Sequence, residues 1–111
     1  MLFINTKPEL QIHRGDTVNI ESEIYSGNNL TKELYKFNEG DELYFAILEP
    51  NQCWENAIVK KKFIEDASHI KLDPKDTMCL FPGLYYYQLK LRNKDGEVFT
   101  LCNRSRLYIL E

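Results

Sequence analysis

The chain has 111 residues, of which 28% are charged and 43% hydrophobic, and its formal net charge is −3. This length predicts one domain, residues 1–111, whose core needs neither a metal ion nor a disulfide. The acidic balance argues against non-specific binding to nucleic acid or to an anionic membrane. No apolar run approaches the ~20 residues that span a bilayer, and residues 1–7 lack the features of a secretory signal.

Alternating apolar and polar side chains, the pattern of half-buried strands, recur from the start of the chain. Weak strands are expected at residues 1–5 and 9–13. A clearer strand is expected at 17–25, where one face carries the apolar side chains Val18, Ile20 and Ile24.

The segment 42–49 is apolar on both faces, which predicts a central strand covered by the core on one side and by a loop or neighbour on the other. The preceding residues 38–41 are typical of a turn. A weak strand is expected at 34–37, although Leu34 and Phe37, with Leu30, also fit the spacing of a helix.

Weak strands are also expected at 57–63 and 68–72. A short helical turn is predicted at 73–79, because Asp73 can cap it and Pro74 occupies its first position, where a missing N–H costs nothing.

The strongest signal is a β-hairpin. The strand 84–92 alternates clearly, and the turn 93–96 ends in Gly96, which accepts a positive φ. The strand 97–102 then returns, and a separate last strand is expected at 106–110.

About seven to nine short strands with one short helical turn predict an all-β fold, an antiparallel β-sandwich of the immunoglobulin-like type. A small barrel shares this pattern, so the strand order stays open. The connections are too short for helical crossovers, which excludes a parallel α/β sheet.

The residues that carry metal or redox chemistry are few. Cys53, Cys79 and Cys102 are widely spaced, unlike a disulfide framework or a structural zinc site. We expect them to be small, partly buried apolar residues in a protein made in a reducing cytoplasm. His13 and His69 have no partners at metal-ligand spacing. No catalytic residue, metal or cofactor is therefore expected.

Three charged motifs have simple structural interpretations. Residues 14–16, Arg-Gly-Asp, are expected to form a turn. The run of lysines at 60–62 is expected on an edge strand or a solvated face. The acidic residues Glu39, Asp41 and Glu42 are expected in a solvated turn.

Aromatic and cationic side chains supply the candidate interface. Tyr85 and Tyr87 fall on the inward face of the hairpin strand and are expected in the core. The side chains expected to point outward, or to serve as an anchor, are Trp54, Tyr86, Lys90 and Arg92. Aromatic and Arg side chains carry most of the energy of protein interfaces.

Several segments together carry a family resemblance. They are IHRGDTV at 12–18, YKFNEGDELYFAI at 35–47, EPNQ at 49–52, IVKKKF at 58–63, DT at 76–77 and LFPGLYYYQLKL at 80–91. In this order they resemble small structural proteins of tailed phages and prophages of Firmicutes. The chain is also similar, more distantly, to the N-terminal domain of phage baseplate upper proteins.

The resemblance implies a non-enzymatic module of a phage tail or baseplate, made in the bacterial cytoplasm and located in the virion. It would dock to other tail proteins or to copies of itself, so a homo-oligomer is one expected state. The alternative is a carbohydrate-binding module for host cell-wall glycan, with Tyr86 or Trp54 exposed on a concave sheet face.

Overall fold

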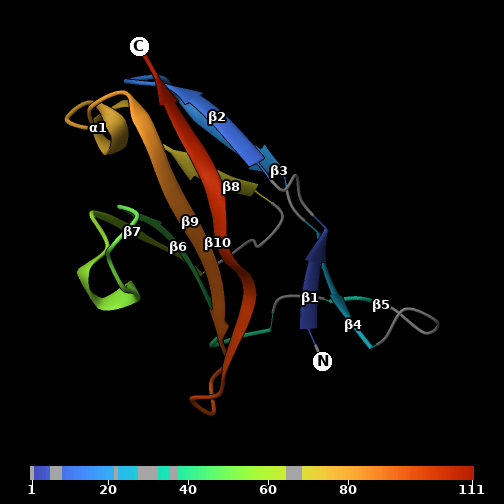
Figure 1. The fold of residues 1–111 in the computed structure, drawn as a ribbon. Helices are drawn as coiled ribbons and strands as arrows, with labels where there is room; N and C mark the ends of the chain where they lie inside the picture. The colour runs from blue at the N-terminus through green and yellow to red at the C-terminus, as the bar shows by residue number, and fades with distance from the viewer. Residues whose placement is uncertain (1, 6–8, 22, 28–32, 36–37, 65–68) are drawn as a thin grey trace.

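Ten strands and two short helical turns make up the described part of the chain, residues 2–5, 9–21, 23–27, 33–35, 38–64 and 69–111 of a computed structural model (Figure 1). The strands are β1 (Leu2–Asn5), β2 (Glu9–His13), β3 (Val18–Glu21), β4 (Glu23–Ser26), β5 (Glu33–Leu34), β6 (Glu42–Leu48), β7 (Val59–Phe63), β8 (His69–Leu72), β9 (Gly83–Arg92) and β10 (Val98–Leu110). The helical turns are η1 (Trp54–Asn56) and α1 (Pro74–Thr77). The all-β prediction is confirmed. None of the described helices is long and apolar enough to cross a membrane.

The main sheet has five strands in the order β2-β10-β9-β6-β7. The β6–β7, β6–β9 and β9–β10 pairs are antiparallel. However, β2 runs parallel to β10, with Glu9 beside Arg106 and His13 beside Leu110. The prediction of a purely antiparallel sandwich is wrong at this pair, because alternation reveals which side chains share a face but not the direction of the neighbouring strand.

A second layer covers one face of the main sheet and consists of two separate ladders. β3 pairs with β8, and β4 pairs with β1 and with β5. The predicted strand 17–25 is thus divided between two ladders. Leu34 of the predicted strand 34–37 lies in β5, while residues 36–37 are outside the described part of the chain.

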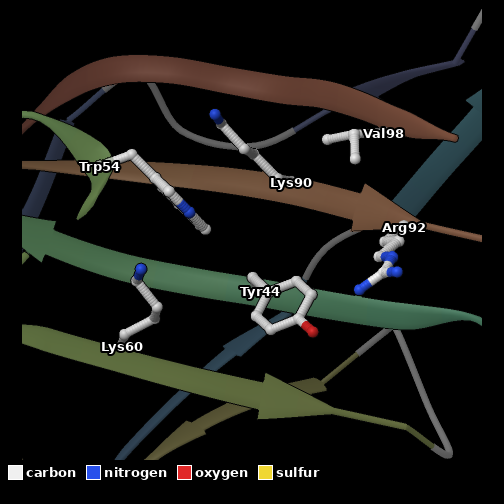
Figure 2. Close-up of a pocket in the computed structure, with 6 residues that line it drawn as sticks. All are labelled: Tyr44, Trp54, Lys60, Lys90, Arg92 and Val98. Atoms are coloured by element: carbon white, nitrogen blue, oxygen red, sulfur yellow. The ribbon is translucent and has the colours of Figure 1, made fainter. Parts of the chain in front are cut away.

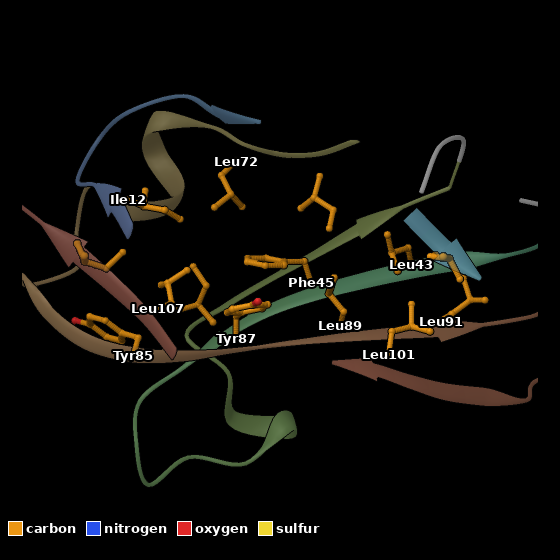
Figure 3. Packing of buried hydrophobic residues seen from close by; sticks show 14 residues of the cluster. Ile12, Leu43, Phe45, Leu72, Tyr85, Tyr87, Leu89, Leu91, Leu101 and Leu107 are labelled. Carbon is orange, nitrogen blue, oxygen red and sulfur yellow. The ribbon is translucent and has the colours of Figure 1, made fainter. Parts of the chain in front are cut away.

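The core lies between the two layers and is centred on β6 and β9 (Figure 3). Phe45 stacks on Tyr87, with ring centroids 5.8 Å apart and planes at 24°. Tyr85 and Tyr87 are both buried, which confirms their predicted inward orientation. Around them pack the apolar side chains Ile12, Leu43, Ile47, Ile70, Leu72, Leu89, Leu91, Leu107 and Ile109.

β10 is a single strand of 13 residues where two strands were predicted, at 97–102 and 106–110. The pairing with β9 shifts between Thr100 and Cys102 and again between Cys102 and Ser105. Within this irregularity Arg104 has a φ of 51°. A β-bulge interrupts the alternation of side chains without ending the ladder. The interrupted alternation therefore led to the prediction of two strands where the structure has one.

The lysine run of β7 is split between two faces. β7 is an edge strand, as predicted, with Lys60 and Lys62 exposed. Lys61 instead points toward the second layer, where its Nζ lies 2.7 Å from Asp76 Oδ2 and 3.2 Å from Asp73 Oδ2. The hydrogen bond from Lys61 lowers the pKa of Asp73. Burial would lower the pKa of Lys61, but its hydrogen bonds to both carboxylates raise it on balance.

The turn α1 confirms the predicted cap. Asp73 occupies the N-cap, Pro74 the first position, and the Asp76 carboxylate accepts the backbone N–H of Asp73 at 2.7 Å. The Thr77 hydroxyl is buried and accepts the N–H of Gly15 at 2.9 Å. This bond fixes the predicted turn at 14–16, in which Gly15 has a φ of 83°.

Asp41 corrects the prediction of a fully solvated acidic turn. Its side chain is only 2% exposed. Its Oδ2 accepts the Tyr35 hydroxyl at 2.6 Å and the Asn38 backbone N–H at 2.8 Å. Burial, together with the hydrogen bond to Asp41, raises the pKa of Tyr35 to about 12.

The cysteines are also more exposed than predicted. Cys53 and Cys79 are exposed, and only Cys102 is half-buried. Cys53 and Cys79 lie in connections between strands rather than on inward strand positions. None of the three forms a disulfide.

A side-chain hydrogen bond ties the start of β9 to the connection that precedes it. The Tyr85 hydroxyl donates a hydrogen bond to the Phe81 carbonyl at 2.9 Å. We predict that Tyr85→Phe lowers the free energy of unfolding by about 1 kcal/mol, the usual contribution of one such bond. Urea unfolding measures this change. The neighbouring Tyr86→Phe variant is the control, and equal losses in both variants would contradict the prediction.

Tyr35 predicts a loss of stability at alkaline pH. Because its pKa in the folded state is raised to about 12 from 10.0, its contribution is complete below pH 10 and is lost as the pH rises toward 12. In an absorbance titration of the tyrosines, Tyr35→Phe should lose a component that ionises near pH 12. Asp41→Asn should move that ionisation to lower pH. If the component lost in Tyr35→Phe ionises near pH 10 instead, the assignment to Tyr35 is wrong.

Candidate functional site

The candidate site lies on the outer face of the main sheet, the face turned away from the core. Tyr44 of β6 is paired with Lys62 of β7 and with Lys90 of β9, so these three side chains share this face. Ala46 and Leu48 also point outward, yet both are fully buried. The prediction that a central strand at 42–49 is covered on both sides is therefore confirmed.

The connection between β6 and β7, residues 49–58, supplies part of this cover. Its helical turn η1 brings Trp54 over the sheet. The indole of Trp54 meets the ring of Tyr44 edge-on, with centroids 6.3 Å apart and planes at 84°. Trp54 is consequently half-buried on the outer face rather than free in solvent.

Arg104 holds this connection against the sheet. Its Nη1 donates to the Gln52 carbonyl at 2.7 Å and its Nη2 to the Pro50 carbonyl at 2.6 Å. Its guanidinium lies 5.0 Å from the centre of the Tyr86 ring. Sequence analysis missed this residue; the only signal was the interrupted alternation between 102 and 106.

A hollow of about 390 Å³ opens beside Trp54 (Figure 2). Lys60 Nζ lies 4.8 Å and Lys90 Nζ 4.7 Å from the centre of the Trp54 ring, on opposite sides of it in Figure 2. Such contacts between a cation and an aromatic ring are attractive. The complete lining is Tyr44, Trp54, Lys60, Lys90, Arg92 and Val98.

Three of the four residues predicted for the interface meet in this hollow, namely Trp54, Lys90 and Arg92. Tyr86 points outward as predicted but does not line the hollow, and it is in contact with Arg104 instead. Lys60 was assigned only to an edge strand or a solvated face. Lys60 lines the hollow because Trp54 lies beside it in the folded chain. The alternation of side chains along a strand does not predict that contact.

The cations of the hollow have no close carboxylate partner. Among the described side chains, no carboxylate lies within 4.0 Å of the charged nitrogens of Lys60, Lys90 or Arg92. Glu42 is the cross-strand neighbour of Arg92 but accepts the hydroxyl of Tyr44. That hydrogen bond raises the pKa of Tyr44, and the nearby Arg92 opposes the shift.

Glu55 is the other carboxylate near these cations. Its pKa is lowered mainly by its own backbone N–H and by Cys53, with smaller contributions from Lys90 and Lys60. Glu55 therefore offsets part of the charge of the two lysines. The hollow keeps an excess of positive charge beside aromatic surface, a combination suited to binding an anionic group.

Neither a group of metal-ligating side chains in the described residues nor a match to a known protein indicates an activity. In the described ranges, no three His, Cys, Asp or Glu side chains are grouped so that they could hold a metal ion. No protein-family model, curated protein or solved structure matches the chain.

Arg104 gives this site a direct test. We predict that Arg104→Ala destabilises the fold by about 1–3 kcal/mol, since two hydrogen bonds from a charged group are lost. Arg104→Gly loses the same bonds but should be about 1 kcal/mol more stable than the alanine variant, because glycine adopts the φ of 51° without strain. Urea unfolding measures both differences.

The emission of Trp54, the single tryptophan, reports the position of the 49–58 connection in the same variants. Both variants should shift this emission to longer wavelength as the connection leaves the sheet. Wild-type stability together with unchanged emission would show that Arg104 does not hold it.

Proposed function

We propose that this protein is a non-enzymatic structural or assembly module of a phage tail or baseplate. It acts by protein–protein docking through the outer face of the main sheet. The observation that carries this proposal is an uneven distribution of charge. The chain has a net charge of −3, yet on one sheet face the cations outnumber the carboxylates Glu9, Glu42 and Glu55. These cations are Lys60, Lys62, Lys90, Arg92, Arg104 and Arg106. Its partner is an acidic surface of a neighbouring tail or baseplate protein in the virion.

The hollow has the properties of an interface anchor. Trp, Tyr and Arg dominate the binding energy of protein interfaces, especially where they are held in place before binding. Trp54 is held by Tyr44 and by the Arg104 contacts to its connection. The surrounding cations would speed association with an acidic partner and make it dependent on salt.

The tail or baseplate setting is supported by the resemblance of the sequence. The motif residues occupy positions where strands begin: Gly15 and Asp16 precede β3, Gly40 and Asp41 precede β6, and Gly83 opens β9. They specify a scaffold rather than a reaction. The hydrogen bond from the Tyr85 hydroxyl back to the Phe81 carbonyl resembles the tyrosine corner of immunoglobulin-like sandwiches and supports that classification.

A carbohydrate-binding module for host cell-wall glycan is the second candidate, favoured by the pairing of Trp54 with Tyr44 in the hollow. A sugar ring needs an open aromatic face. Lys60 and Lys90 lie over the Trp54 ring, and Arg104 lies over Tyr86, which makes this candidate weaker. Glycan-array binding that is lost in Tyr86→Ala or Trp54→Ala would favour it over protein docking.

The docking proposal predicts a complex with a tail or baseplate protein encoded by a neighbouring gene, or with further copies of this chain. Light scattering and sedimentation of defined mixtures measure it. Charge reversal by Lys60→Glu, Lys90→Glu and Arg92→Glu should abolish the complex, and 0.5 M salt should weaken it. A strict monomer at high concentration that binds none of these proteins would overturn the proposal.

A further inference from the structure

We infer that the hollow recognises an extended acidic peptide segment of the docking partner, with alternate carboxylates of that segment bound by Lys90 and Arg92. This inference rests on the proposed docking function and names the chemistry of the partner.

The cations form a spaced row rather than a single cluster. Lys90 and Arg92 are two residues apart on β9 and both line the hollow, so their backbones are separated by ~7 Å along the strand. An extended peptide repeats its side chains on one face with the same spacing. Alternate Glu or Asp residues of such a segment therefore match Lys90 and Arg92 one to one.

A second pair of cations repeats this spacing on β7. Lys60 and Lys62 are also two residues apart and pair with Ala46 and Tyr44 of the intervening strand β6. The two rows are ~10 Å apart, two strand spacings. A phosphate or sulfate group needs donors that converge within hydrogen-bond distance of one centre. This wider lattice instead fits several separate carboxylates.

The charges are accessible to a ligand because the local carboxylates do not pair with them. Glu42 is held by the Tyr44 hydroxyl, and no described carboxylate lies within 4.0 Å of Lys90 or Arg92. The volume of about 390 Å³ lies in the range of ligand pockets and accepts one or two side chains. Val98 adds an apolar wall for the methylene groups of a Glu side chain.

Trp54 makes the inference directly measurable, because it lines the hollow and is the single tryptophan of the chain. The probe is a nine-residue peptide with Glu at every second position and Ser between. A peptide of the same composition with its Glu residues clustered is the comparison, and inorganic phosphate and polyphosphate are further ligands. Trp54 emission is followed at low ionic strength during each titration.

The alternating peptide should change Trp54 emission saturably and bind more tightly than the clustered peptide or either phosphate ligand. The double variant Lys90→Ala, Arg92→Ala should weaken its binding about tenfold. The double variant Lys71→Ala, Lys75→Ala removes the same charge from β8 and α1 and should bind like the wild type. Circular dichroism confirms that each variant is folded.

Equal or tighter binding of the clustered peptide or of a phosphate ligand would overturn the inference, as would equal weakening by the two double variants or no saturable change. These outcomes are separable from failure of the docking function. A tail partner that binds Lys90→Ala, Arg92→Ala as well as wild type would leave docking intact and remove this mode of recognition. If the alternating peptide binds as described but no tail partner is found, recognition of acidic peptides stands and the docking function fails.

Discussion

A central strand that is apolar on both faces has to be covered twice, and this constraint organises the molecule. The inward face of β6 is covered by the second layer, with Phe45 stacked on Tyr87. On its outward face, Ala46 and Leu48 are removed from water beneath the 49–58 connection and its neighbours, which Arg104 fastens to the sheet. Trp54 belongs to this connection, so the candidate site forms where the outward face of β6 is covered.

Local pattern was sufficient for most of the strands and insufficient for their assembly. The hairpin of β9 and β10, the two-sided burial of β6 and the cap at Asp73 follow from alternation and turn chemistry, which act over a few residues. The parallel β2–β10 pair and the bulge around Arg104 depend on contacts between distant segments. The hydrogen bonds that Tyr35 and Asn38 donate to Asp41 offset the cost of burying its carboxylate. The neighbouring acidic residues along the chain gave no sign of these bonds.

The candidate site divides in the same way. Lys90 and Arg92 could be placed on the outer face because they alternate with buried residues of β9. The same alternation separates the lysines at 60–62. Lys60 and Lys62 lie on the outer face, whereas Lys61 lies on the opposite face and contacts carboxylates. What sequence reasoning could not supply was the path of the 49–58 connection, and with it the meeting of Trp54 with Lys60 and Lys90.

The parallel pairing of β2 with β10 has a mechanical consequence. If tension is applied at Glu9 and at Leu110, the two strands are pulled in opposite directions along their common axis. The backbone hydrogen bonds of that ladder are then sheared together instead of being unzipped one at a time. The backbone N–H of Arg14 donates a further hydrogen bond to the Leu110 carbonyl, with N and O 2.7 Å apart, at the end of the ladder where the force acts. We therefore expect this ladder to resist tension between Glu9 and Leu110 more strongly than a ladder that opens one bond at a time.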